Sequence, residues 1–344
     1  MPFYQFILTP MSSFMTPIKG DTLFGHICWQ LANDPELAAT SLDILLADYA
    51  KKPFLVVSSG FSMTAANQHA TFLAPRPNLP ASSMINGAGM TRLEKQQKAK
   101  FLKRMRWIQV DTEKWLSHGK SVLDLQPDRP SSTNLFNTDM LMQTELRQHN
   151  TINRLTQTTG KGQFAPYQVA GTRFAKNVRL CVFAYLNTEM LSPEALNIAV
   201  ARIGAFGYGK DASIGMGRFE VETFKEIQWP LLNEKATGLY TLSPANLCDW
   251  DTSQTFSTPF IRYGKHGDRM ATHGNPFKNP VIMADEGAVL ARCPLLENST
   301  VPGVVGAPAN HISISMPSAI CQGYALGIPW YAPLPNTATA TGDR

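Results

Sequence analysis

Apolar and polar positions alternate or recur with regular periods along the first part of the chain. The stretch "FYQFILT" has the aromatic and β-branched residues of a strand, and "DTLFGHICWQLA" repeats apolar side chains with the period of an α-helix. Asp21 is expected to cap this helix. "PFLVVSSGF" predicts a second strand, and "HATFLAPRP" ends in a third. The first half of this unit therefore has the order β-α-β-β.

A similar pattern occupies residues 163 to 224. "QFAPYQVAGTRFA", "NVRLCVFAYL" and "GRFEVETF" predict strands, and "SPEALNIAVARIGAF" predicts a helix. Ser192 is expected to cap that helix, with Pro193 in its first turn and Gly204 at its end. The second half therefore has the order β-β-α-(hairpin)-β. A β-α-β-β-α-β order is the ferredoxin-like or RRM-like arrangement, and we assign this arrangement to residues 1–228.

The remaining residues predict a second domain. A chain of 344 residues is long for one hydrophobic core. Beyond Trp229, "TPFIRYG", "PVIMADEGAVLA" and "HISISMPSAICQGYAL" have strand character with Gly and Pro turns between them. We therefore expect an α+β protein in which residues 229–344 form a second, mostly β domain.

A basic insertion is expected at about residues 76–150. "TRLEKQQKAKFLKRMRW" holds seven basic residues and one acid, while Leu93, Phe101, Met105 and Ile108 recur at helical spacing. This predicts an amphipathic basic helix, whose charges either contact nucleic acid or a partner or form a solvated face. The cations concerned are Lys100, Lys103, Arg104 and Arg106.

Charge and cysteine content narrow the function class only slightly. Lys and Arg total 31 against 26 Asp and Glu, a net charge of +5, which permits a polyanionic partner without requiring one. The five cysteines are scattered and odd in number, as in proteins of a reducing cytoplasm. The N-terminus has neither a basic start nor a long apolar segment, so we expect neither secretion nor membrane insertion.

Metal and catalytic signatures are weak. No two histidines stand four residues apart, and neither a Gly-x-Ser-x-Gly elbow nor a Walker lysine occurs. His266 and His273 share a loop, but their spacing matches a metal site poorly. A solvated basic loop is the favoured interpretation. Asp249 and Asp251 in "CDWDT" favour a turn over a paired carboxylate site. We therefore expect no catalytic residue, metal or cofactor.

Two further histidines, His26 and His149, are candidates for a general base. His26 lies on the apolar helix and is expected to be a hydrogen-bonded core or boundary residue. His149 in "RQHNTINRLT" has no recognisable partner in the sequence. Neither residue alone predicts an enzyme.

The stretch "FGYGKDASIGMGRFEV" combines glycines with positive charge. If Gly215 and Gly217 let a phosphate approach the main chain, Lys210 and Arg218 supply charge and Ser213 a hydroxyl, which would make a phosphate cradle. A glycine-rich hairpin is the alternative interpretation.

A second basic stretch, "NTINRLTQTTGKG", joins cations to hydroxyls and glycines. Arg154 and Lys161 lie in this stretch, and such a mixture can bind phosphate oxygens through side chains and backbone N–H groups together. The tip of a β-hairpin is the alternative.

Four motifs in order resemble a known family. "KGDTLFGHICWQLA", "FLAPRPNLP", "HNTINRLTQTTGKGQF" and "IGAFGYGKDASIGMGRFEV" are similar to RAMP proteins of CRISPR effector complexes, most of all to the Csm-type subunit of type III-A complexes that binds the 5′ tag of the guide RNA. The resemblance spans about residues 1 to 225, and "SMPSAICQGYALGIPW" is similar to the family's C-terminal end. It implies two RRM-like domains with a glycine-rich loop and no nuclease centre.

The resemblance also implies which residues bind RNA. The expected RNA-binding residues are Lys19, Arg154, Lys161, Lys210, Ser213, Gly215, Gly217 and Arg218. Possible contacts to nucleic acid or a partner are Lys100, Lys103, Arg104, Arg106, Arg262, Lys265 and Arg269. The chain departs from the family at Met216, where a lysine commonly stands between the last two glycines.

By this resemblance the chain is a cytoplasmic, non-catalytic subunit that caps the 5′ tag of the crRNA. Its expected partners are the crRNA, a backbone RAMP subunit and a large polymerase-like subunit. Three alternatives stay open. These are a tag-binding subunit of a minimal type I effector that contacts target DNA near the PAM, an endoribonuclease using His149 or His26, and a purely structural subunit.

Overall fold

The computed structural model describes most of the chain. It describes residues 2–331, apart from 65–70, 82–83, 86–88, 112–140, 249, 252, 254, 273 and 298, together with residues 334 and 335. The middle of the expected insertion, residues 112–140, therefore lies outside the described part. Among the described helices, none is both long and apolar enough to cross a membrane.

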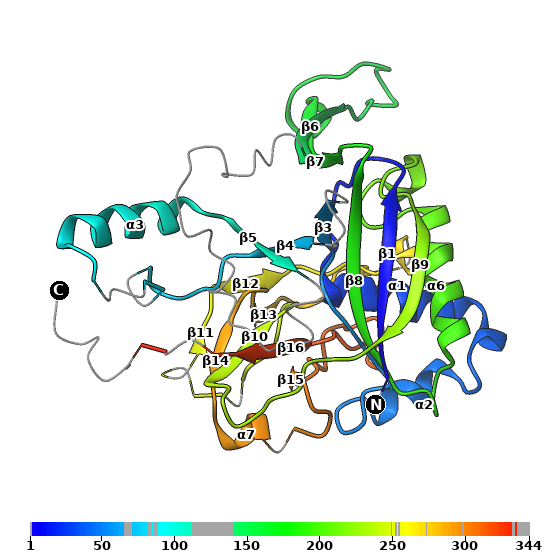
Figure 1. Ribbon diagram of the computed structural model, residues 1–344. Helices are drawn as coiled ribbons and strands as arrows, with labels where there is room; N and C mark the ends of the chain where they lie inside the picture. The colour runs from blue at the N-terminus through cyan, green and yellow to red at the C-terminus, as the bar shows by residue number, and fades with distance from the viewer. Residues whose placement is uncertain are drawn as a thin grey trace.

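A large antiparallel sheet is built from the N-terminal two thirds of the chain (Figure 1). Its path runs β5-β4-β3-β8-β1-β9, and β2 also pairs with β8. Its strands are β1 Phe3–Pro10, β2 Leu55–Val57, β3 Phe61–Thr64, β4 Thr71–Pro75, β5 Trp107–Asp111, β8 Val178–Leu186 and β9 Phe219–Ile227. The strands predicted in "FYQFILT", "NVRLCVFAYL" and "GRFEVETF" are thus confirmed. The central strand β8 is buried along nearly its whole length, as its continuous apolar run requires.

Helix α1 (Gly20–Asn33) packs beside α6 (Pro193–Phe206) on one face of this sheet (Figure 1). The cap of α1 is Lys19, so the prediction that Asp21 caps it is wrong. Asp21 lies in the first turn and is buried, because its carboxylate binds the guanidinium of Arg262 from the C-terminal part of the chain.

Helix α6 begins as predicted. Ser192 accepts a hydrogen bond from the amide of Ala195 at 3.1 Å, and Pro193 occupies the first turn. The helix continues to Phe206 and ends at Gly207, whose φ is 111°, so the predicted end at Gly204 is wrong. The remaining short helices are α2 Leu42–Ala47, η1 Pro35–Leu37, η3 Gly162–Phe164, η4 Ala212–Ile214, η6 Asp268–Ala271 and α7 Pro294–Glu297.

A second sheet is built from the C-terminal part of the chain. It runs β11-β14-β10-β16-β15, and β12 pairs with β13 in a separate two-stranded sheet. Its elements are β10 Gly238–Thr241, β11 Thr255–Phe256, β12 Pro259–Arg262, β13 Val281–Ala284, β14 Val289–Ala291, β15 Val304–Gly306 and β16 Tyr324–Trp330. Residues 311–320, which were predicted as strand, have no regular structure. The mixed content confirms the α+β class.

The main hydrophobic core is continuous between the two sheets. Phe3 stacks on Trp229 with ring centroids 4.9 Å apart, and β16 contacts β2 and β8. Buried Gln322 completes the join, because its carboxamide accepts from the amide of Val57 at 2.9 Å and donates to the Val57 carbonyl at 2.8 Å. The two sheets therefore hold each other at a fixed orientation.

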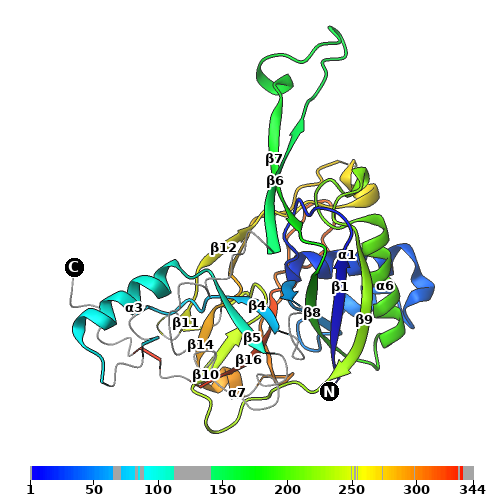
Figure 2. The same cartoon turned by 45° about the horizontal axis from the view of Figure 1, so that its top comes forward.

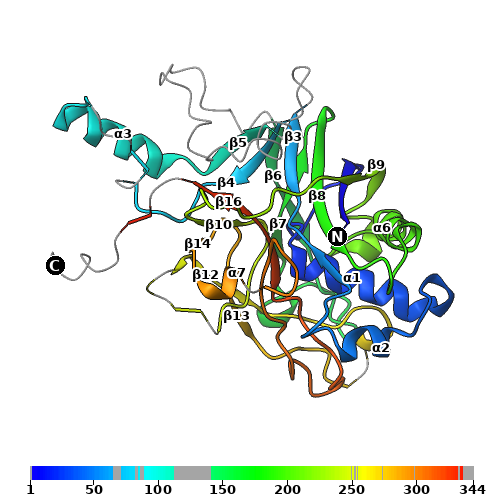
Figure 3. The ribbon, with the colours of Figure 1, turned by 60° about the horizontal axis from the view of Figure 1, so that its bottom comes forward.

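The basic helix α3 (Arg92–Arg104) extends away from the body (Figures 1 and 3). Thr91 and Glu94 form a capping box at its start. The helix stops at Arg104, and Ile108 lies in β5, which pairs with β4. Leu93 is 63% exposed, so the predicted apolar stripe over Leu93, Phe101, Met105 and Ile108 is wrong. The C-terminal part of α3 packs on the core, through Ala99, Phe101 and Leu102.

A long β-hairpin projects from the body in a different direction from α3 (Figure 2). Its strands are β6 (Met142–His149) and β7 (Tyr167–Phe174), paired from Met142 with Phe174 to His149 with Tyr167. Residues 150–166 form its tip. The sequence predicted β7 but placed β6 in an irregular polar insertion.

Candidate nucleic-acid interface

The glycine stretch forms a loop between α6 and β9, which we call the glycine loop and define as residues 207–218. Gly215 and Gly217 have φ of 88° and 69°, where a side chain is strained. Their surroundings differ. A Cβ on Gly217 would lie 2.1 Å from the carbonyl oxygen of Tyr208, whereas one on Gly215 would meet nothing within 4 Å. Gly217 is thus required for packing, and Gly215 faces open space.

The main-chain amides of the glycine loop are mostly used within the protein. Gly217 N–H donates to the carbonyl of Ser13 at 2.8 Å, and Gly215 N–H donates to the carbonyl of Ala212 at 2.9 Å. The amide of Arg218 donates to Ser12 Oγ at 2.8 Å. The expected cradle of glycine amides is therefore not formed in this conformation. What the loop presents instead are the exposed side chains of Lys210, Ser213 and Arg218.

The start of the glycine loop is fixed on α1. The amide of Gly209 donates to His26 Nε2 at 3.2 Å, and that of Lys210 donates to Thr16 Oγ1 at 3.0 Å. Burial lowers the pKa of His26 to about 4, so its ring is neutral at pH 7 and can accept this bond. The hydroxyl of buried Tyr208 donates to the carbonyl of Pro17 at 3.1 Å. His26 is thus the hydrogen-bonded boundary residue that the sequence predicted.

The hairpin lies against the glycine loop. His149 Nε2, at the end of β6, is 3.4 Å from Asp211 Oδ2 in the loop. The His149 ring stacks on Tyr167 with centroids 5.4 Å apart, and Lys210 Nζ lies 6.0 Å from the centroid of the same Tyr167 ring. Sequence reasoning gave His149 no partner, because Asp211 is remote in the chain. The fold therefore unites two stretches that the sequence treated separately.

Further contacts hold the base of the hairpin. Phe14 and Thr172 exchange backbone hydrogen bonds of 2.8 Å in both directions. The hydroxyl of Ser13 donates to the carboxylate of Glu145 on β6. A side chain at Gly171 would be crowded here, since a Cβ would lie 2.9 Å from the carbonyl oxygen of Phe14 and would displace the end of the Met15 side chain. These contacts make the hairpin base and the glycine loop one continuous surface, which we call the loop–hairpin surface.

The hairpin also supplies cations that the sequence analysis did not select. Arg147 contacts the sulfur of Met216, the position at which the chain departs from the resembling family. Arg173 and Lys176 are exposed at the hairpin base, and Tyr167 is 49% exposed. The basic and aromatic residues of "YQVAGTRFAK" were visible in the sequence, but nothing local showed that Tyr167 lies beside Lys210 of the glycine loop.

Arg154 and Lys161 are both exposed in the hairpin tip, which extends away from the body of the molecule (Figure 2). The structure thus has the predicted hairpin tip, and a phosphate-binding role for it stays a prediction. Lys100, Lys103, Arg104 and Arg106 are exposed on and just after α3, on another part of the molecule.

Two predicted cations are engaged inside the chain. Lys19 Nζ lies 2.5 Å from Asp285 Oδ1 and 2.7 Å from Glu286 Oε2. Arg262 forms a bidentate salt bridge with Asp21, in which Nη2 donates to Oδ1 at 2.9 Å and Nε donates to Oδ2. Because these charges are already neutralised, we leave both residues out of the proposed RNA contacts.

Lys265 and Arg269, which were also predicted as possible contacts to nucleic acid or a partner, follow β12 in the chain. Lys265 Nζ lies 5.7 Å from the centroid of the Phe277 ring. The side chain of Arg269 is outside the described part of the structure.

The weak metal and carboxylate candidates have structural partners where the structure describes them. His266 is buried, with its Nε2 2.7 Å from Ser313 Oγ, so the solvated loop considered for it is wrong. Asp251 accepts from the amide of Ser253 at 2.8 Å, which is a turn. His273 and Asp249 lie outside the described residues. No group of three His, Cys, Asp or Glu side chains in the described part could hold a metal ion.

Comparison with known proteins connects this geometry to a family. The family model of the CRISPR-associated protein Cas_Cmr3 matches residues 48–276, which is well over half of the chain. No curated protein matches the sequence.

Solved structures resemble the fold. A chain in the crystal structure of the Csm3-Csm4 subcomplex of the type III-A CRISPR-Cas interference complex is similar with a TM-score of 0.55 and 12% identity, covering 96% of this chain and 99% of that one. A chain in the crystal structure of a Csm1-Csm4 cassette in complex with AMPPNP has a TM-score of 0.53 and 16% identity, covering 97% and 99%. At such identities the likeness shows the fold. The family match shows that the chain belongs to the Cas_Cmr3 family of CRISPR-associated proteins.

Proposed function

We propose that this chain is a non-catalytic subunit of a CRISPR-Cas ribonucleoprotein effector in antiviral defence, and that it binds the 5′ tag of the crRNA on the loop–hairpin surface. The observation that carries the proposal is the contact between His149 and Asp211, which joins the hairpin to the glycine loop. Lys210 and Arg218 from the loop then lie along one surface with Arg147 from the hairpin, although Arg147 is partly neutralised because its Nε lies 3.7 Å from Glu145 Oε1. Ser213 and the open side of Gly215 complete it.

This surface has the chemistry that single-stranded RNA requires. Cations neutralise phosphates, and exposed aromatic rings stack on unpaired bases. Tyr167 is such a ring, and Lys210 beside it adds charge next to the stacking surface. With the glycine amides bonded internally, phosphate contacts come from side chains. The role of Gly215 is then to leave space for the RNA backbone. The role of Gly217 is to let the loop pack against Tyr208.

The finer description of the fold is part of the proposal. We propose an N-terminal RRM-like domain over residues 1–228 and a mostly β RRM-like domain over residues 229–344. For the first, the order β3-β8-β1-β9 with α1 and α6 on one face supports this description. For the second, the support is a separate five-stranded sheet.

We propose a type III effector as the setting, in the cytoplasm. The family match and the likeness to chains from Csm1-Csm4 and Csm3-Csm4 assemblies favour type III over a minimal type I effector. By the same likeness, the partners are a backbone RAMP subunit and a large polymerase-like subunit. The hairpin tip with Arg154 and Lys161 reaches out to the guide or to the backbone subunit.

Sequencing the RNA that copurifies with the native complex tests the proposed function. We expect every molecule to begin with one uniform, repeat-derived 5′ tag. In complexes carrying the double variant K210A/R218A, less tagged RNA should be retained than with the wild type. RNA with heterogeneous 5′ ends in the wild-type complex would refute tag binding.

One observation favours a second function. His149 Nε2 lies 3.4 Å from Asp211 Oδ2, and a histidine beside a carboxylate is a possible arrangement for a general base. Both atoms are buried, and neither makes a hydrogen bond within the described residues. Incubating the purified chain with repeat RNA decides between the two functions. Cleavage that is lost in H149A would replace the proposal with an endoribonuclease, whereas intact RNA retains a binding subunit.

A further inference from the structure

Helix α3 carries one continuous face of positive charge. With 3.6 residues per turn, several exposed polar side chains project within about 120° of one another around the helix axis. Leu102, which is buried in the core, lies on the other side of the helix. We call the exposed set the basic face, and its members are Arg92, Gln96, Lys100, Lys103 and Arg104.

The cations of the basic face have no counter-ions within the protein. Within the described residues, no ion pair or hydrogen bond engages any of their four side chains. Glu94, the one acid of the helix, projects outside this face. It is also held in the capping box, where its carboxylate accepts from the amide of Thr91 at 2.7 Å. The charge of the basic face is therefore available to a ligand.

The stability of the helix does not explain all of these cations. Lys103 and Arg104 lie in the last turn, where the helix dipole favours positive charge. Arg92, however, lies in the first turn, where the same dipole disfavours it. Lys100 and Arg104 repel each other across one helical turn. A bound polyanion would offset both unfavourable terms.

The composition of the basic face favours a nucleic acid over an acidic protein. The centres of protein interfaces are poor in lysine and rich in aromatic anchors. The basic face has no aromatic member, and the only apolar side chain within its arc is Leu93. Arginine, lysine and glutamine are instead the side chains that contact phosphates.

The length of the basic face also suits a nucleic acid. Arg92 and Arg104 are separated by about 18 Å along the helix axis, at 1.5 Å per residue. One strand of a duplex carries a phosphate about every 3.4 Å along its axis. The basic face is therefore long enough to contact several successive phosphates.

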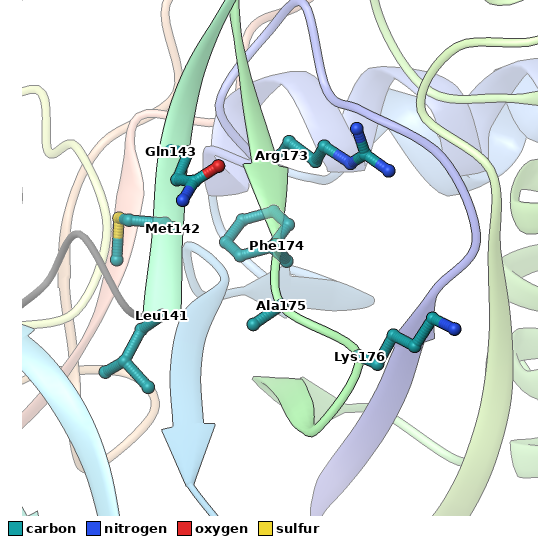
Figure 4. Close-up of a pocket in the computed structure, with 7 residues that line it drawn as sticks. All are labelled: Leu141, Met142, Gln143, Arg173, Phe174, Ala175 and Lys176. Carbon is teal, nitrogen blue, oxygen red and sulfur yellow. The ribbon is translucent and has the colours of Figure 1, made fainter.

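The basic face is distinct from the loop–hairpin surface. Figures 1 and 2 both show α3 extending from the body in a different direction from the hairpin. The exposed cations at the hairpin base are Arg173 and Lys176, which line a small cavity of about 190 Å³ (Figure 4). They belong to the loop–hairpin surface, whereas none of the cations of α3 does.

We propose that α3 binds the sugar–phosphate backbone of a nucleic-acid segment outside the 5′ tag. The cations contact phosphates, so this binding does not depend on base sequence. The segment comes either from the rest of the guide or from a strand paired with it, and both present the same chemistry. The proposal goes beyond the proposed function and does not rest on it, because α3 contributes nothing to the loop–hairpin surface.

Acetylation footprinting of the full-length chain, read by mass spectrometry, tests the proposal residue by residue. A single-stranded RNA that lacks the tag sequence should slow acetylation of Lys100 and Lys103 by at least about threefold at low salt. Lys51 and Lys235, which are exposed elsewhere, should not be protected. Polyglutamate at the same charge concentration represents an acidic protein surface and should protect Lys100 and Lys103 less.

A charge variant measures the same contact as an affinity. K100Q/R104Q keeps good helix formers and removes two cations, so the negative slope of log affinity against log salt should become less steep by about 1.4. K225Q/K235Q removes the same charge from exposed positions elsewhere and should leave the slope unchanged. The K210A/R218A variant should keep the protection of Lys100 and Lys103, which separates this site from the tag site.

Two arms in the native complex distinguish the source of the segment. Protection of Lys100 and Lys103 that disappears on nuclease digestion of the crRNA identifies the guide. Protection that appears only after complementary RNA is added identifies the paired strand.

Other outcomes overturn the proposal. Protection in the complex that survives nuclease digestion would identify a protein partner, and protection in neither arm would leave α3 without a ligand. In the free chain, equal protection by polyglutamate, or an unchanged salt slope in K100Q/R104Q, would equally contradict it.

Discussion

The imidazole of His26 accepts a hydrogen bond from the amide of Gly209 at 3.2 Å, and this bond fixes the start of the glycine loop on helix α1. Only a neutral ring can accept here. The same helix carries Lys19 at its cap, where the backbone amide donates to Tyr208 Oη at 3.2 Å. The position of the loop therefore depends on a residue that titrates.

We predict that acid destabilises the protein through His26. Its pKa in the folded chain is about 4, below its ordinary 6.5, so protons bind the unfolded state more strongly. This contribution to stability is complete above pH 6.5 and is lost as the pH falls towards 4, by at most about 3 kcal/mol. Chemical denaturation at pH 7 and pH 4.5 measures it. H26Q keeps an acceptor that does not titrate and should lose less stability between these values; equal losses would contradict the assignment.

We predict opposite outcomes for substitutions at two glycines of the loop. G217A should cost more than about 3 kcal/mol, because its Cβ would strike the backbone of Tyr208 in addition to the strain of a positive φ. G215A should cost about 1 kcal/mol from strain alone, because its Cβ meets open space. Urea unfolding checks both.

Gly25 is the matched control for this pair. It lies inside α1 with nothing within 4 Å of an added Cβ, so G25A should stabilise the chain by about 0.5–1 kcal/mol. Equal stabilities of G217A and G215A would show that Gly217 is not packed as described.

We predict that K210A/R218A weakens binding of single-stranded tag RNA by about 10- to 100-fold at moderate salt. The slope of log affinity against log salt is negative, and the loss of two phosphate contacts should make it less steep by about 1.4. Filter binding at several salt concentrations measures both quantities. K225A/K235A removes the same charge from exposed positions elsewhere. A similar loss in this control would mean that net charge, and not the loop–hairpin surface, determines binding.

We predict that Q322A destabilises the protein by about 2–4 kcal/mol. The substitution leaves the buried N–H and C=O of Val57 without their partners, and each unsatisfied group costs about 1–3 kcal/mol. The exposed Q228A should change stability by less than about 0.5 kcal/mol. An equally small effect of Q322A would show that the join between the sheets does not depend on this carboxamide.

The sequence predicted the elements that carry an apolar face or a cap. Strand β8 has a continuous apolar run, and Ser192 with Pro193 marks the start of α6, so local physics specifies both. The end of α6 was placed at Gly204, although that glycine is there because a Cβ would strike the carbonyl of Phe219 at 2.2 Å. Tertiary packing, which a single helix does not reveal, selects this residue.

The missed elements share a physical reason. Strand β6 pairs only with β7 in a hairpin that stands away from the core, so it needs no buried face and shows no apolar alternation. The candidate site was also predicted only in part, because a contact between segments far apart in the chain completes it. Lys210, Ser213 and Arg218 could be selected from the glycine stretch, but Arg147 and Tyr167 become part of it only through the pairing of His149 with Asp211.

The most direct test of RNA binding on the loop–hairpin surface is photo-crosslinking of the native complex, assembled with crRNA that carries 4-thiouridine at single positions of the 5′ tag. Mass spectrometry then identifies the crosslinked peptides of this chain. We expect crosslinks within residues 141–176 and 207–218. Crosslinks confined to α3 or to residues 229–331, with none on the glycine loop or the hairpin, would contradict this account.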